Sequence, residues 1–104
     1  MKTRRAVNWT KRSKTRLRVR QDWIERESGY HDIAVNWAMQ VNESVAQLAD
    51  FPKIGRVVPE IQRDDIREII VAKTTRVIYK VREHSCDILT VRRCYEQITG
   101  IRSL

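Results

Sequence analysis

The chain has 104 residues, of which 41% are hydrophobic and 33% are charged, and its formal net charge is +8 at pH 7. The length predicts a single domain over residues 1–104, and the apolar content is that of a globular domain rather than a disordered chain. No apolar run is long enough to span a bilayer, and no apolar core follows the cationic first residues, so we expect a cytoplasmic protein without a signal peptide. The excess of Lys and Arg predicts an anionic partner, and charge alone leaves nucleic acid, a ribosome-like surface, an anionic membrane and an acidic protein open.

The first third of the chain predicts a strand followed by a helix. Residues 4–9, RRAVNW, are partly apolar and predict an opening strand. Thr10 is a suitable N-cap for a helix that contains no Pro or Gly and that ends at Ser28-Gly29. Its inward positions are expected to form a thin stripe consisting of Ser13, Leu17, Trp23 and Ile24.

A second helix comes next, and its apolar residues recur at helical spacing. They are Ala34, Trp37, Ala38, Val41, Val45 and Leu48. Pro52 ends this helix because the residue before a proline is disfavoured in helical geometry. Two helices joined by a short turn predict an antiparallel helical hairpin. Trp9, Trp23 and Trp37 fall at core-like spacings, so we expect packing residues rather than base-stacking platforms.

A rigid segment links the helices to the second half of the chain, because Pro52, Gly55 and Pro59 lie within eight positions. Pro52 stops the helix, Gly55 is expected to permit a turn with positive φ, and Pro59 stiffens the approach to the next strand. A purely structural crossover and a functional segment are both open at this point.

Residues 66–72, 74–82 and 87–93 are dense in β-branched residues and joined by short connections, which predicts an antiparallel meander. In the second run Val77, Tyr79 and Val81 share one face and are expected in the core, opposite Arg76 and Ile78; in the third, Leu89 and Val91 are expected to share a face. The fold class is therefore α+β, in the order β-α-α-β-β-β, with the helical hairpin on one face of a small, mainly antiparallel sheet.

Cys86 and Cys94 are the only cysteines. On one extended strand they would lie roughly 26 Å apart, at about 3.3 Å per residue, which is too far for a disulfide. His84 does not complete a zinc site with them. We expect reduced thiols, no metal and no cofactor.

Four motifs succeed one another in the second half: PKIGRVVPE (52–60), RE (67–68), RVIY (76–79) and ILTVRR (88–93). Their order resembles the RelE/ParE superfamily of bacterial toxin–antitoxin toxins. The first half agrees more loosely, through VNWTKRSKTRL and a helix ending in LADFP. The resemblance implies a stress or plasmid-maintenance toxin, neutralised by a small acidic antitoxin. RelE-like members cut mRNA in the ribosome, whereas ParE-like members poison DNA gyrase.

RNA cleavage requires a group that activates the 2′-hydroxyl, cations that hold the phosphate and an acid for the leaving oxygen. Arg67 and Arg76 match basic positions of the RelE-like cluster, but an expected lysine falls on Ile69 and no tyrosine lies in a following helix. The set of another branch is matched by Glu60, Arg67 and Tyr95, without the histidine expected beside the tyrosine. The candidate catalytic residues, if the protein is a nuclease, are Glu60, Arg67, Arg76 and Tyr95.

The ParE-like branch lacks this cluster and is expected to act by binding. Arg56, Arg92 and Arg93 are then the candidate target-binding residues, together with the tail CYEQITGIRSL (94–104). A solvated strand end for Arg92 and Arg93, and a loop-tying role for Arg56, are the alternatives. We rank the gyrase poison first, the ribosome-dependent mRNA endonuclease second and a non-toxic basic nucleic-acid-binding module third.

A cationic run in the first predicted helix is the strongest electrostatic feature: Lys11, Arg12, Lys14, Arg16, Arg18 and Arg20. It predicts the footprint of an anionic partner, with a solvated helix surface as the alternative. An open sheet edge beside a basic surface is also a receptor for an acidic, partly disordered antitoxin that folds on binding. The expected partners are this antitoxin and either gyrase or the ribosome with its mRNA, and no membrane.

Overall fold

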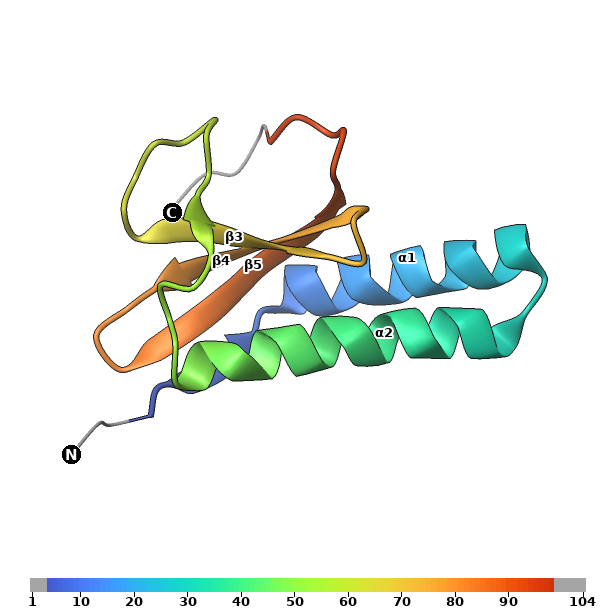
Figure 1. Ribbon diagram of the computed structural model, residues 1–104, viewed down its shortest axis with the longest axis horizontal. Coiled ribbons are helices and arrows are strands. Elements are labelled where there is room, and N and C mark those ends of the chain that lie inside the picture. The colour runs from blue at the N-terminus through green and yellow to red at the C-terminus, as the bar shows by residue number, and fades with distance from the viewer. Residues whose placement is uncertain (1–3, 99–104) are drawn as a thin grey trace.

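The computed structural model describes residues 4–98, which form two helices packed under one sheet (Figure 1). Its elements are β1 (Ala6–Trp9), α1 (Lys11–Ser28), α2 (His31–Ala46), the short 3-10 helix η1 (Gln47–Ala49), β2 (Arg56–Val57), β3 (Ile66–Val71), β4 (Thr75–Val81) and β5 (Ser85–Arg93). The predicted α+β class and the predicted order of the helices and main strands are confirmed. The two-residue strand β2 was not predicted. No helix among the described residues is long and apolar enough to cross a membrane.

The five strands lie in the order β1-β5-β4-β3-β2. The neighbours from β2 to β5 pair antiparallel, as the predicted meander requires, whereas β1 pairs parallel with β5. The first strand of the chain therefore lies against the last, and both helices are contained in the connection that leaves β1. The two edge strands, β1 and β2, are short, which limits the exposed hydrogen-bonding edge.

The ends of α1 are set by its capping residues. The side chain of Thr10 accepts a hydrogen bond from the backbone N–H of Ser13, which satisfies one of the donors left free at a helix N-terminus. Gly29 adopts the left-handed conformation with φ 76°, and its N–H donates to the carbonyl of Glu25. The predicted start and end of this helix are confirmed.

The main hydrophobic core lies between the helices and the sheet. It consists of Trp37, Val41, Val45, Leu48, Val71, Val77, Tyr79, Cys86, Ile88 and Val91. The apolar stripe predicted for the second helix supplies the first four of these residues. Tyr79 is fully buried, as expected for a core residue, and the indole N–H of Trp37 donates to the Thr75 hydroxyl at 3.0 Å.

A second, smaller cluster lies on the other face of the sheet, which we call the outer face. It consists of Val58, Ile66, Ile78 and Ile98, with Ile61 and Leu89 packed against it. The expectation that Leu89 and Val91 share a face was wrong. Tyr79 pairs with Ile88 while Ile78 pairs with Thr90, so Leu89 is an extra residue in β5 and the alternation shifts by one.

Gly55 packs against the backbone of β3. A Cβ atom at this position would lie 2.4 Å from the carbonyl oxygen of Glu68 and 2.8 Å from the hydroxyl of Tyr79. Its N–H donates to that hydroxyl at 3.0 Å. The expected positive φ was wrong, since Gly29 is the glycine with a positive φ among the described residues. Gly55 is required because the crossover approaches the sheet too closely for any side chain.

Candidate functional site

A network of ion pairs lies on the outer face of the sheet and consists of Arg56, Glu60, Glu68 and Arg76. The guanidinium of Arg76 donates from Nε to Glu68 at 2.6 Å, and from Nη1 and Nη2 to the two oxygens of Glu60 at 2.8 Å each. Arg56 donates from Nε to the other oxygen of Glu68 at 2.6 Å. The side chains of Arg76 and Glu68 are 5% and 0% exposed, so the centre of the network is shielded from water.

The protonation states in this network are set by its ion pairs. Hydrogen bonds from Arg76 lower the pKa of Glu60 from 4.5 to about 2, with a further contribution from the backbone N–H of Ile98. Hydrogen bonding to Glu60 raises the pKa of Arg76 above its ordinary value. Four of the five N–H groups of Arg76 donate to Glu60, Glu68 and the carbonyl of Glu96. A carboxylate with so low a pKa is a weak base, and this arginine has little capacity to hold a phosphate.

Arg67 lies on the opposite side of β3 from Glu68, as adjacent residues of a strand must. Its guanidinium donates to the carbonyl of Gly55 at 2.8 Å, and to the carbonyl and carboxylate of Asp64 at 2.9 and 2.7 Å. It therefore ties the crossover to the start of β3.

Tyr95 lies beyond the end of β5, where it is 73% exposed. Its ring packs under the guanidinium of Arg93, 4.7 Å from the ring centre. Of the four candidate catalytic residues, the structure thus brings Glu60 and Arg76 into contact, binds Arg67 to the crossover and places Tyr95 beside Arg93.

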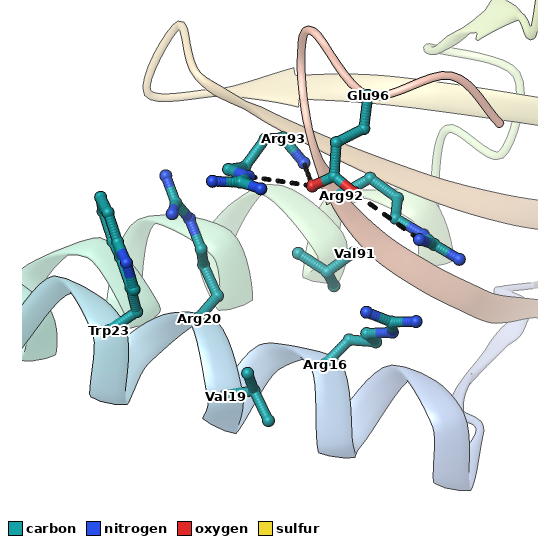
Figure 2. A pocket seen from close by; sticks show the side chains of 8 residues that line it. All are labelled: Arg16, Val19, Arg20, Trp23, Val91, Arg92, Arg93 and Glu96. Atoms are coloured by element: carbon teal, nitrogen blue, oxygen red, sulfur yellow. Dashed lines mark hydrogen bonds and ion pairs between the residues drawn. The ribbon is translucent and has the colours of Figure 1, made fainter.

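A pocket of about 260 Å³ lies between α1 and the end of β5. Its lining residues are Arg16, Val19, Arg20, Trp23, Val91, Arg92, Arg93 and Glu96 (Figure 2). Arg92 and Arg93, two of the three candidate target-binding residues, therefore face two arginines of the first helix. Arg56, the third, lies in the outer-face network with a side chain that is 62% exposed.

The charges in this pocket are unequal, because four arginines are opposed by one carboxylate. Glu96 accepts hydrogen bonds from Nε and from the backbone N–H of Arg93 at 3.0 and 3.1 Å, and its carboxylate lies 3.6 Å from Nη1 of Arg92. Burial, and then the charge of Arg93, lowers the pKa of Arg20. Burial, and then the charge of Arg16, lowers the pKa of Arg92. The pocket is thus a concave surface with an excess of positive charge.

Sequence reasoning did not place Arg16, Arg20, Trp23 and Glu96 in one site. The expectation that Trp23 is a core residue was wrong: it is 39% exposed, and the guanidinium of Arg20 stacks over its ring at 4.4 Å. Ser13 is buried while Leu17 and Ile24 pack against the core, so Trp23 lies at the margin of their stripe. The spacing of Arg16 and Arg20 by four residues was the available signal, since it places both on one helix face.

No group of three or more potential metal ligands occurs among residues 4–98. Cys86 is buried and Cys94 is exposed, and neither forms a disulfide.

Comparison with known proteins connects this chain to a family. Residues 7–98 match the family model described as the ParE toxin of the type II toxin–antitoxin system parDE. The chain belongs to the ParE toxin family. It is thus a type II toxin by family, and the predicted ParE-like branch of the RelE/ParE superfamily is confirmed.

A solved structure described as the chromosomal ParDE TA system from P. aeruginosa contains a chain with the same fold as this ParE-family protein. The two superpose with a TM-score of 0.72 at 18% sequence identity, over 86% of this chain and 95% of the other. No curated protein matches the sequence.

Proposed function

We propose that this ParE-family toxin inhibits DNA gyrase by binding, without cleaving RNA, and that it acts in the cytoplasm. The observation that carries the proposal is the pairing of Glu60 with Arg76. Among the four candidate nuclease residues these two lie in contact, because the guanidinium of Arg76 donates two hydrogen bonds to the carboxylate of Glu60. The hydrogen bonds that Arg76 donates to Glu60 leave a weakened base and a shielded cation, which favours a binding function over acid–base chemistry.

The target-binding residues in this proposal are Arg56, Arg92 and Arg93. The side chain of Arg93 is 37% exposed and that of Arg56 is 62% exposed, so both are accessible to a protein target. Arg92 is 15% exposed and acts from within the pocket. The predicted contact tail begins at Cys94, and its residues 99–104 lie outside the described residues.

Two assays on the induced or purified protein separate the candidate activities. We expect gyrase to accumulate cleaved DNA in the presence of the toxin, with filamentation and an SOS response in cells. Arg93→Gln should weaken this effect several-fold, while Arg26→Gln, which removes an equal charge from the exposed end of α1, should leave it unchanged. Immediate translation arrest with mRNA cut at codons would replace the gyrase proposal by the RelE-like nuclease, and Tyr95→Phe should then reduce cleavage.

We further propose that an acidic antitoxin neutralises the protein by covering an apolar and basic surface just before β2. A hollow there is lined by Arg5, Asp50, Phe51, Pro52, Lys53 and Ile54. Phe51 and Ile54 are 55% and 56% exposed, and the edge strand β2 follows directly. An extended chain with acidic and apolar residues matches both features.

Co-expression with the product of a neighbouring short acidic reading frame should restore growth and allow the two proteins to be purified together. Ile54→Asp should weaken the complex at least tenfold, because it places a carboxylate where apolar contact is expected. Met39→Asp is the matched control, since Met39 is 53% exposed on α2. Equal weakening by the two substitutions would move the antitoxin surface elsewhere.

A further inference from the structure

The pocket between α1 and β5 continues into a second hollow. The second hollow is lined by Lys11, Arg12, Thr15, Arg16 and Val19, so the two share Arg16 and Val19. Together they form one groove along α1, which we call the α1–β5 groove. Its cationic residues are Lys11, Arg12, Arg16, Arg20, Arg92 and Arg93.

The cations of this groove are arranged as a row. Arg12, Arg16 and Arg20 succeed one another at intervals of four residues, which places them on one face of α1 about 6 Å apart along the helix axis. Arg16 and Arg20 extend from α1 toward the end of β5, where Arg92 and Arg93 lie (Figure 2). The row therefore runs along the helix and ends against the last strand.

Hydrogen-bonding capacity within the groove is left unused. The Nε atoms of Arg20 and Arg92 are buried, and neither has a hydrogen-bond partner among residues 4–98. A buried donor without a partner is costly, and an anion that accepts from it removes that cost. The carboxylate of Glu96 forms its ion pairs with Arg93 and Arg92, and among residues 4–98 neither Arg16 nor Arg20 forms an ion pair.

We propose that the α1–β5 groove binds the sugar–phosphate backbone of a nucleic-acid strand. Regularly spaced arginines match a ligand that carries one negative charge per nucleotide, and each guanidinium suits the paired oxygens of a phosphate. The groove also presents Trp23, which is 39% exposed, and Val19, which is 54% exposed. An aromatic face beside a cationic row suits bases and sugars better than it suits an acidic peptide.

Glu96 acts as an internal competitor in this proposal. Its carboxylate pairs with Arg92 and Arg93 in the free protein. When a phosphate enters the groove, this carboxylate must move away, or its repulsion of the phosphate weakens binding. Removing its charge and removing a groove arginine should therefore change affinity in opposite directions. If only the net charge of the protein attracted the strand, every Arg→Gln substitution would weaken binding by the same amount. A larger effect at the groove arginines than elsewhere therefore distinguishes binding in the groove from attraction by net charge.

The test is the affinity of the full-length protein for fluorescently labelled oligonucleotides, measured by anisotropy at several salt concentrations. Single-stranded DNA, duplex DNA and single-stranded RNA are compared, since all share the backbone chemistry. Arg16→Gln and Arg20→Gln should each weaken binding about three- to tenfold and reduce the salt slope by about one. Glu96→Gln should tighten binding several-fold.

Arg18→Gln is the matched control. Arg18 is exposed on the same helix between the two test positions, and it does not line the groove. Thermal melting checks that each variant is folded, and Arg16 is the decisive position if Arg20→Gln is unstable, because Arg16 is exposed. The fluorescence of Trp23 gives an independent reading: oligonucleotide should change it in the wild type, and Trp23→Phe should remove that change.

Three results would overturn the proposal: no binding at low salt, equal effects of Arg16→Gln and Arg18→Gln, or displacement of the strand by polyglutamate at the same concentration of charge. The last of these would assign the groove to an acidic protein. The assay contains no gyrase, so failure of the gyrase proposal would leave the nucleic-acid result standing, and the reverse also holds.

Discussion

The carboxylate of Glu60 accepts two hydrogen bonds from the guanidinium of Arg76, and both N–O distances are 2.8 Å. This pair joins the crossover after Pro59 to the start of β4. The same carboxylate accepts the backbone N–H of Ile98 at 3.1 Å, so it also holds the chain that comes after β5. The ionised side chain of Glu60 therefore holds together three segments that are distant in sequence.

The first prediction concerns stability in acid. The folded protein lowers the pKa of Glu60 to about 2 from its ordinary 4.5, so the carboxylate favours folding when it is ionised. Its contribution is fully present above pH 4.5 and is lost as the pH falls through about 2. We expect the free energy of unfolding, measured by urea denaturation between pH 6 and pH 2, to lose on the order of 2 kcal/mol from this group.

Glu60→Gln is the control for this pH dependence. The variant should be less stable at neutral pH by roughly 2 kcal/mol, because Arg76 is left buried with one carboxylate instead of two. Between pH 4.5 and pH 2 it should lose less stability than the wild type does. Parallel curves for the two proteins would mean that Glu60 does not titrate in this range.

The second prediction concerns two glycines that are required for different reasons. Gly55→Ala should destabilise the protein by about 2 kcal/mol or more, because its Cβ would lie 2.4 Å from the backbone oxygen of Glu68. Gly29→Ala should cost about 1 kcal/mol, since Gly29 has φ 76° and open space around it.

Asparagine distinguishes the two positions. It tolerates the left-handed conformation, so Gly29→Asn should recover part of the stability, whereas Gly55→Asn should be at least as harmful as Gly55→Ala. Midpoints of thermal or urea unfolding measure all four variants. Rescue by asparagine at Gly55 would contradict the close-approach explanation.

The third prediction concerns the buried hydrogen bond from Trp37 to Thr75. Thr75 is 1% exposed and accepts the indole N–H at 3.0 Å. Thr75→Val keeps the shape but removes the acceptor, and it should cost about 1–2 kcal/mol in urea denaturation. Thr75→Ser keeps the hydroxyl, so the near-ultraviolet circular dichroism of the tryptophans should stay closer to that of the wild type. Equal spectra and equal losses for both variants would show that the hydrogen bond contributes little.

The fourth prediction concerns the thiols. Cys94 is exposed, whereas Cys86 is buried and burial raises its pKa, so its reactive thiolate is disfavoured as well as shielded. A thiol reagent at neutral pH should modify one cysteine rapidly and the second only in denaturant. Cys94→Ser should abolish the rapid phase, and persistence of that phase would place Cys86 in contact with solvent.

The sequence by itself determined the two helices, the four longer strands and their order along the chain. The stripe from Trp37 to Leu48, the cap at Thr10 and the alternation of Val77, Tyr79 and Val81 are local patterns, because helix and strand periodicities involve only residues close along the chain. The motif order from Pro52 to Arg93 likewise sufficed to indicate the family.

Only the tertiary structure decided which distant residues meet. The parallel pairing of β1 with β5 and the extra residue at Leu89 depend on register between strands, and no local pattern encodes that register. The same long-range packing presses Gly55 onto β3 and brings Arg92 and Arg93 against Arg16 and Arg20. These residues meet neighbours that are distant in sequence, so their arrangement depends on the fold rather than on their spacing.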